Sequence, residues 1–77
     1  MFIEVEYRGE VLKVRLYFLR TSFSISSLGP VIFSVDGLDE NGHCRILYSS
    51  HDALEAWEVY QKLWAMCDKA AQEAKDV

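Results

Sequence analysis

Three consecutive residues, Ser50, His51 and Asp52, are of the types that form the catalytic triad of a hydrolase. A triad needs three convergent side chains, which usually come from distant parts of the chain. Consecutive side chains diverge instead, and Ser or Asp just before a helical pattern is typical of an N-cap. Glu55 follows Asp52 at the spacing of a capping box. The pattern therefore favours helix capping over catalysis, and we predict no catalytic residue and no enzyme.

The chain has few soft metal ligands, and their spacing matches no zinc pattern. They are His43, Cys44, His51 and Cys67. The adjacent residues His43 and Cys44 would point to opposite faces of a strand. Cys67 is expected to pack as a small hydrophobic residue. We therefore predict no metal site and no cofactor.

Acidic residues gather in one short stretch that is rich in turn-forming residues. Asp36, Asp39 and Glu40 resemble part of a calcium loop, but Leu38 occupies a ligand position. Asp, Asn and Gly are ordinary turn residues, and Asn41-Gly42 is a strong hairpin signal. We therefore expect an acidic hairpin tip rather than a calcium site.

A long amphipathic helix over residues 52–75 is the element against which the rest of the chain must pack. Apolar residues recur there at steps of three and four, which places them on one side of a 3.6-residue helix. The stripe consists of Ala53, Trp57, Tyr60, Trp64, Cys67, Ala71 and Ala74, widened by Ala56, Leu63 and Ala70. The expected core combines the centre of this stripe (Trp57, Tyr60, Leu63, Trp64 and Cys67) with Ile3, Val5, Val14, Leu16 and Phe18.

Two segments of alternating hydrophobicity, residues 2–7 and 11–20, predict the first β-hairpin. Gly9 indicates the turn, because a two-residue hairpin needs positive φ at its first or both central positions. We place Gly9 and Glu10 at the centre of the turn. The resulting pairs are Tyr7 with Leu12, Val5 with Val14, Ile3 with Leu16, Glu6 with Lys13, and Glu4 with Arg15.

The middle of the chain is interpreted as a loop followed by a second hairpin. Residues 21–30 are Ser-rich and end in Gly29-Pro30, so we treat them as a long loop with apolar anchors. Alternatively, Phe23, Ile25 and Leu28 extend the second strand or cap an open edge of the core. Strands are expected at residues 31–35 and 44–48. The predicted fold is α+β, a four-stranded antiparallel meander packed on one face by a C-terminal helix, in one domain from 1 to 77.

Composition limits the classes of function. The chain has 77 residues, a net charge of −4 and a pI near 5.0, whereas a nucleic-acid-binding domain is normally basic. Two cysteines are too few for a disulfide framework. The first residues do not resemble a signal peptide, and no segment is long and apolar enough to span a membrane. We therefore expect a cytoplasmic protein that binds neither nucleic acid directly nor a membrane.

The sheet carries more apolar residues than one helix can cover. The face opposite Leu12, Val14 and Leu16 still contains Phe2, Val11, Tyr17 and Leu19. Either Phe23, Ile25 and Leu28 fold over that face or it is a contact surface. The helix, about 36 Å long, is also expected to extend past the sheet with its Ala-rich end. These features favour a homodimer over a monomer.

The overall profile resembles in type the small phage-encoded inhibitors, anti-CRISPR proteins among them, which act by occupying a surface of a host protein. The resemblance concerns size, acidity and element order, and it covers no specific residues. It implies a viral, non-enzymatic protein-binding module that inhibits a nucleic-acid-handling protein. The alternative is a structural or regulatory homo-oligomer. The expected contact residues are Asp36, Asp39, Glu40, Glu55, Glu58, Phe2 and Tyr17.

Overall fold

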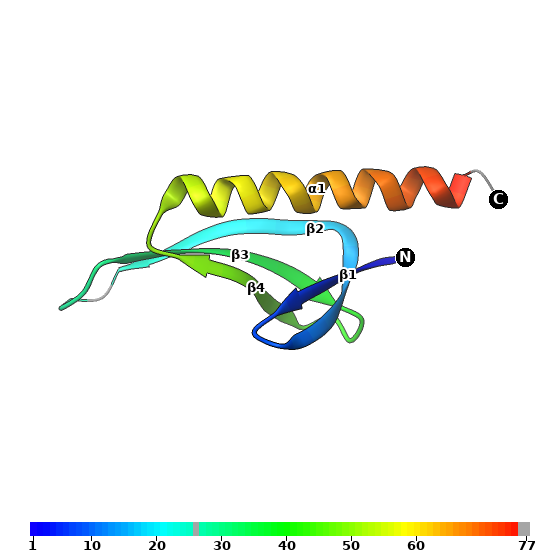
Figure 1. The fold of residues 1–77 in the computed structure, drawn as a ribbon. Helices are drawn as coiled ribbons and strands as arrows, with labels where there is room; N and C mark the ends of the chain where they lie inside the picture. Colours follow the sequence, from blue (N-terminus) through cyan, green and yellow to red (C-terminus); the bar gives the residue numbers. More distant parts are fainter. Residues whose placement is uncertain (26, 76–77) are drawn as a thin grey trace.

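Four strands and one helix follow one another in the computed structural model, which describes residues 1–25 and 27–75. The strands are β1 (Phe2–Tyr7), β2 (Glu10–Ile25), β3 (Val31–Asp39) and β4 (Cys44–Ser50), and the helix is α1 (Ala53–Lys75). The sheet order is β1-β2-β3-β4 with antiparallel neighbours, and α1 contacts all four strands along one face (Figure 1). The predicted fold class is confirmed.

The first hairpin turns at Arg8 and Gly9, one residue earlier than predicted. Both residues have positive φ, 51° and 78°, as a type I′ turn requires at its two central positions. Val5 therefore pairs with Leu12 rather than with Val14. The predicted register is wrong by two residues, but the predicted faces are right because side chains alternate with a period of two.

A bulge bends β2 between Val14 and Leu19, where its pairing with β3 shifts register. Tyr17 lies in the bulge with a φ of 67°, a left-handed conformation that is uncommon outside glycine. The bulge changes which residues face the core. Leu19 packs against the core, whereas Phe18 is 60% exposed. The prediction that placed Phe18 in the core and Leu19 on the opposite face is wrong for this reason.

Residues 21–25 belong to β2 and not to a loop. β2 runs to Ile25 and pairs there with Val31 of β3, so the alternative in which Phe23 and Ile25 extend the second strand is the correct one. The aromatic and β-branched residues of this segment favour a strand, and the serines do not prevent it. The end of the β2–β3 hairpin extends past the start of α1 (Figure 1).

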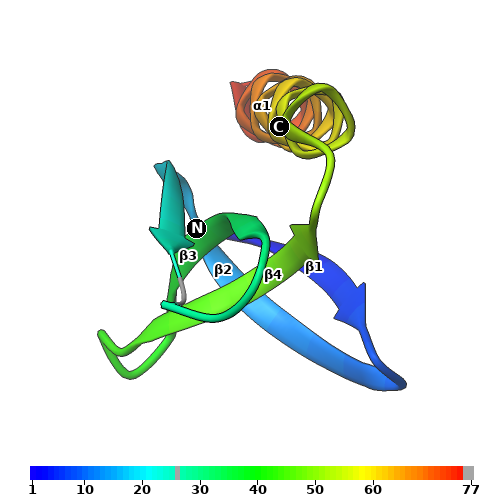
Figure 2. The same ribbon diagram turned by 90° about the vertical axis from the view of Figure 1, so that its left-hand side faces the viewer.

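The sheet is strongly curled, so that its outer strands β1 and β4 approach each other (Figure 2). A hydrogen bond of 2.8 Å joins Tyr7 Oη and Ser49 Oγ across the gap. Arg45 Nη2 of β4 also lies 3.2 Å from Glu10 Oε1 at the start of β2. The curl forms a concave face that α1 covers.

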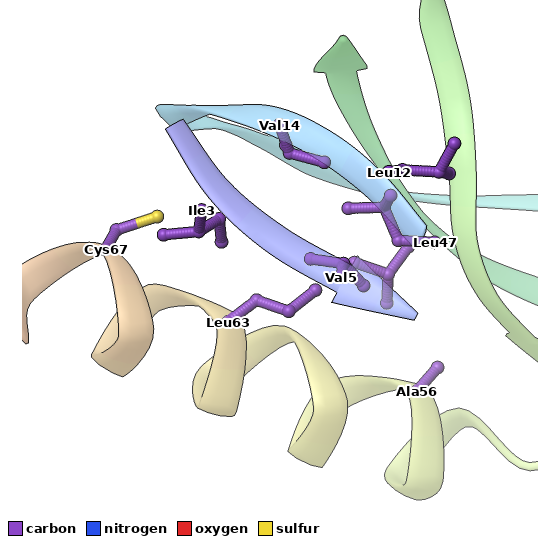
Figure 3. Packing of buried hydrophobic residues seen from close by; sticks show 9 residues of the cluster. Ile3, Val5, Leu12, Val14, Leu47, Ala56, Leu63 and Cys67 are labelled. Atoms are coloured by element: carbon purple, nitrogen blue, oxygen red, sulfur yellow. The ribbon is translucent and has the colours of Figure 1, made fainter. Parts of the chain in front are cut away.

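The core lies between this concave face and α1, and Figure 3 shows it from close by. Its buried members are Ile3, Val5, Leu12, Val14, Val35, Leu47, Ala56, Leu63 and Cys67. The prediction is confirmed for Leu63 and Cys67 but wrong for Trp57, which is 49% exposed. Tyr60 and Trp64 are only partly buried. Of the predicted strand partners, Ile3, Val5 and Val14 are confirmed.

The start of α1 confirms the predicted cap at Asp52 but not the capping box with Glu55. Asp52 Oδ1 accepts a hydrogen bond of 2.9 Å from the Leu54 N–H, which identifies Asp52 as the N-cap. Ser50 Oγ accepts a bond of 3.0 Å from the Asp52 N–H, so Glu55 does not close a capping box. At the other end, α1 extends past the sheet as predicted (Figure 1).

Candidate protein-binding surface

Two of the three carboxylates predicted at the acidic hairpin tip are buried. Asp36 is 5% and Asp39 6% exposed, because β3 continues through both of them. Asp36 Oδ2 accepts hydrogen bonds from Ser22 Oγ at 3.0 Å and from Arg20 Nε at 3.3 Å. Only Glu40 is exposed in the turn. The prediction that all three carboxylates are exposed together at the hairpin tip is therefore wrong.

Asp39 organises the turn between β3 and β4. Its Oδ1 atom accepts hydrogen bonds from the His43 N–H at 2.8 Å and the Asn41 N–H at 2.9 Å. The bond from His43 is the main cause that lowers the pKa of Asp39 below 3.8, and Arg45, 3.6 Å away, adds to it. The carboxylate of Asp39 therefore stabilises this turn and is not free to make a surface contact.

We expect Asp39→Asn to destabilise the protein at neutral pH and to have little effect in acid. A carboxylate whose pKa is lowered by folding stabilises the native state above its unfolded pKa, about 3.9. This contribution disappears as the pH falls through the lower, native pKa. The difference in urea midpoint between wild type and D39N should therefore shrink as the pH is lowered from 7 to below 4. Glu40→Gln, one residue further on and exposed, is the control and should leave the midpoint unchanged at pH 7.

The predicted contact residues on the helix, Glu55 and Glu58, have different surroundings. Glu55 accepts hydrogen bonds from Tyr48 Oη at 3.0 Å and Ser50 Oγ at 2.9 Å, which ties α1 to β4. The bond from Tyr48 is also the main reason that the pKa of this tyrosine is raised above 10.0. Glu58 is exposed. Of these two predicted contact residues, Glu55 is therefore held by hydrogen bonds to β4, whereas Glu58 is not.

The two predicted aromatic contacts, Phe2 and Tyr17, are not brought together. Phe2 lies under the Arg15 guanidinium, whose Cζ atom is 5.6 Å from the ring centroid. Tyr17 faces the helix, because its Oη donates a 2.8 Å hydrogen bond to Asp68 Oδ1. This bond is the main cause that raises the pKa of Tyr17 above 10.0. The bulge in β2 accounts for the change of face.

Tyr17 instead ends a row of four aromatic rings along α1. Its ring centroid lies 5.1 Å from that of Trp64, which lies 6.1 Å from Tyr60, which in turn stacks on Trp57 at 5.4 Å. Such pairs contribute stability beyond the area that they bury. The row marks the side of α1 that faces β2.

A groove of about 470 Å³ lies between the start of α1 and the adjoining strands β2 and β3. Its lining consists of Thr21, Ser22, Phe23, Phe33, Ser34, Ala53, Ala56 and Trp57. The rings of Phe23 and Trp57, 66% and 49% exposed, are the largest apolar groups in this lining that remain accessible. No predicted contact residue lies in it.

One side of β2 is open next to this groove. β1 pairs with β2 only from Glu10 to Arg15, and beyond the bulge β2 pairs with β3 alone. Within the described chain, residues 18–25 therefore have no strand on their second side. Exposed apolar side chains follow this edge at Phe18, Phe23 and Ile25. We call the open edge of residues 18–25 together with the groove the β2-edge surface.

The residues whose types could support catalysis or metal binding form structural hydrogen bonds or lie too far apart to act together. Ser50 and Asp52 take part in capping, while His51 Nδ1 lies 3.3 Å from the Val31 carbonyl oxygen. Cys44 is an exposed free thiol and Cys67 a buried one. Among residues 1–25 and 27–75, no three His, Cys, Asp or Glu side chains are grouped so that they could hold a metal ion. In the same part of the chain, no helix is long and apolar enough to cross a membrane.

The chain was compared with protein families, curated proteins and solved structures, and none of the three comparisons found a match. The fold therefore defines only a class, an α+β protein made of a four-stranded meander and one C-terminal helix.

Proposed function

We propose that the protein is a non-enzymatic protein-binding module that contacts its partner through the β2-edge surface. The observation that carries this proposal is the open edge of residues 18–25 beside an apolar groove. An unpaired strand edge offers a row of N–H and C=O groups to an extended segment of another chain. The neighbouring groove adds side-chain contacts, for which Phe23 and Trp57 are suitable anchors.

The proposed contact is apolar rather than acidic. Asp36, Asp39 and Glu55 are held by hydrogen bonds within the chain, which leaves Glu40 and Glu58 as the remaining carboxylates of the predicted contact set. Two carboxylates on separate elements do not reproduce a row of phosphates. The first partner class to test remains a nucleic-acid-handling protein of a bacterial host, because the profile resembles small phage-encoded inhibitors.

Trp57→Glu is expected to remove partner binding while the fold is retained. Trp57 is half exposed and lines the groove, where a carboxylate would replace an apolar anchor. Leu54→Glu is the matched control, because Leu54 lies three residues earlier on α1, is more exposed and does not line the groove. Both changes add one acidic residue near the helix N-terminus, where negative charge is favourable.

The measurement is affinity capture from a bacterial extract with wild type, W57E and L54E as baits. Any captured protein is then purified and titrated against all three. We expect L54E to bind like wild type and W57E to bind at least about tenfold more weakly, as the loss of an anchor residue implies. Circular dichroism must show that both variants are folded. A partner that binds W57E as tightly as wild type would contradict the proposal.

A further inference from the structure

Apart from the charge of Arg20, the open edge of β2 lacks the features that usually prevent strands from pairing with other chains. Natural edge strands are commonly protected by lysine, proline, a bulge or a covering element. Residues 18–25 contain no lysine, proline or glycine, and the bulge at Tyr17 lies before them. Eight residues give an edge of about 27 Å. Such an edge is suited to pairing with another extended strand.

Charge favours a second copy of the chain as the occupant. Two proteins of net charge −4 repel each other, and the repulsion at contact is smallest where the two surfaces carry no acidic residues. Residues 18–25 carry a single charge, Arg20, which is paired with the buried Asp36 on its own sheet. The edge is therefore a part of this acidic protein at which two copies can meet without opposing carboxylates.

The side chains of the edge are also self-complementary. Thr21 pairs with Val35, which is buried in the core, so odd-numbered residues of this segment are on the face toward α1. Ser22 bonds to Asp36, so even-numbered residues face the other side. Two antiparallel copies that are centred on Ser22 place Thr21 opposite Phe23. Leu19 is then opposite Ile25, and on the other face Arg20 is opposite Ser24.

We infer that two copies of the chain pair antiparallel through residues 19–25 of β2, centred on Ser22, to form one eight-stranded sheet. The inference rests on the proposed function, because it names a partner for the same surface. The two-fold axis makes the contact isologous, so every pair occurs twice. Both helices then lie on the same face of the joined sheet. A dimer of this kind leaves neither copy with an unpaired segment in the second half of β2.

The size of the contact predicts a weak dimer. A large aromatic side chain covers about 150–250 Å² when it is buried, and Phe23 and Trp57 are half exposed or more. Together with Ile25 they supply about 300 Å² from each copy, compared with about 800 Å² in a standard interface. The dimer should therefore depend on concentration in the micromolar to millimolar range.

Position 24 gives the sharpest test, because it can be given a positive charge in one variant and a negative charge in another. Ser24 is exposed and lies opposite Arg20 of the second copy in the inferred register. Ser24→Lys would create two repulsive pairs across the axis, and Ser24→Glu two attractive ones. We expect the dimer dissociation constant of S24K to exceed that of S24E by about tenfold or more. Added salt should narrow this difference.

The experiment measures mass by light scattering over a concentration series for wild type, S24K, S24E and the control Val11→Lys. Val11 is an exposed apolar residue of β2 in the segment covered by β1. Wild type and V11K should rise from 8.9 kDa toward twice that mass with the same midpoint. Amide hydrogen exchange should show new protection in residues 19–25 at high concentration.

Several results would overturn the inference. These are a constant mass of 8.9 kDa for wild type, equal dissociation constants for S24K and S24E, or new protection at the Ala-rich end of α1 instead of β2. The proposed function is judged separately by the W57E and L54E baits. A wild type that stays monomeric but loses its partner through Trp57→Glu removes the self-pairing and keeps the binding module. A dimer that behaves as expected while W57E binds the partner normally removes the proposed partner site instead.

Discussion

Replacing Leu63 by alanine is expected to lower the free energy of unfolding by about 2–5 kcal/mol. Leu63 is buried at the middle of α1 and points toward Val5 of β1 in the core (Figure 3). Its removal leaves a cavity between helix and sheet that the curled strands cannot easily close. In a domain of this size each kcal/mol corresponds to about 4–8 °C in melting temperature. L63A should therefore melt at least about 8 °C below wild type. Urea unfolding should likewise show that L63A is less stable than wild type.

The informative comparison is Trp57→Ala, which removes a larger side chain from the same helix. We expect this change to cost less than Leu63→Ala, because Trp57 is half exposed and stacks on the ring of Tyr60, which is itself only partly buried. Leu63→Met keeps the volume and should cost less than about 1.5 kcal/mol. If W57A proves more destabilising than L63A, the core is centred on the tryptophan side of the helix, and the packing described above is wrong.

The order of the elements could be predicted because each rests on a local pattern. The apolar residues of α1 follow a 3.6-residue period without interruption by Gly or Pro, and Asp52 supplies its N-cap. Phe2–Tyr7 and the first half of β2 alternate with a period of two. Both signals depend on neighbours within a few residues. They therefore hold even though the register of the first hairpin is displaced.

The orientation of individual side chains could not be predicted where the backbone departs from regular geometry. Tyr17 adopts positive φ without being Gly, Asn or Asp, so its sequence gives no warning of the bulge. A single such position changes the face of every residue after it, which explains the errors at Phe18 and Leu19. The pairing of β3 with β4 also shifts register, between Val35 and Asp36 of β3.

The helix side that faces the sheet depends on space rather than on hydrophobicity. Ala56, Leu63 and Cys67 are the buried residues of α1, and the small side chains of Ala56 and Cys67 allow a close approach to the concave face. The large rings of the same stripe are displaced to the side, where they stack on one another. Periodicity identifies the stripe, but it cannot tell which part of the stripe meets a sheet whose curvature is unknown.

The sequence does not reveal the candidate site, because the Ser-rich composition of residues 21–30 predicts a loop there. Phe23 and Ile25 alternate with serines as strand residues do, but the Ser-rich composition favoured a connection. Whether a strand has an unpaired side depends on the lengths of its neighbours, which are not encoded locally. At the acidic residues, the sequence suggests an exposed contact surface that the structure does not have. Asp36 and Asp39 have the composition of a turn, yet β3 extends through both and buries them.

Gly37→Ala is expected to destabilise the protein by about 1–3 kcal/mol, the usual cost of overpacking a core. Gly37 lies on β3 between these two aspartates, in the core rather than in the turn that its neighbours suggested. A Cβ atom at this position would lie 2.6 Å from Val14 Cγ1 and 2.8 Å from Leu47 Cδ1. Both neighbours are themselves buried, so neither has room to move away.

A double-mutant cycle with Val14→Ala tests whether this close approach is the cause. Val14→Ala removes the atom that would be nearest to the new methyl group, so G37A should cost less in that background than in wild type. The measurement is the free energy of unfolding in urea for the wild type, both single variants and the double variant. Additive costs would mean that Gly37 is required for a reason other than its contact with Val14. A stabilised single variant G37A would show that β3 lies farther from β2 at this point than 2.6 Å implies.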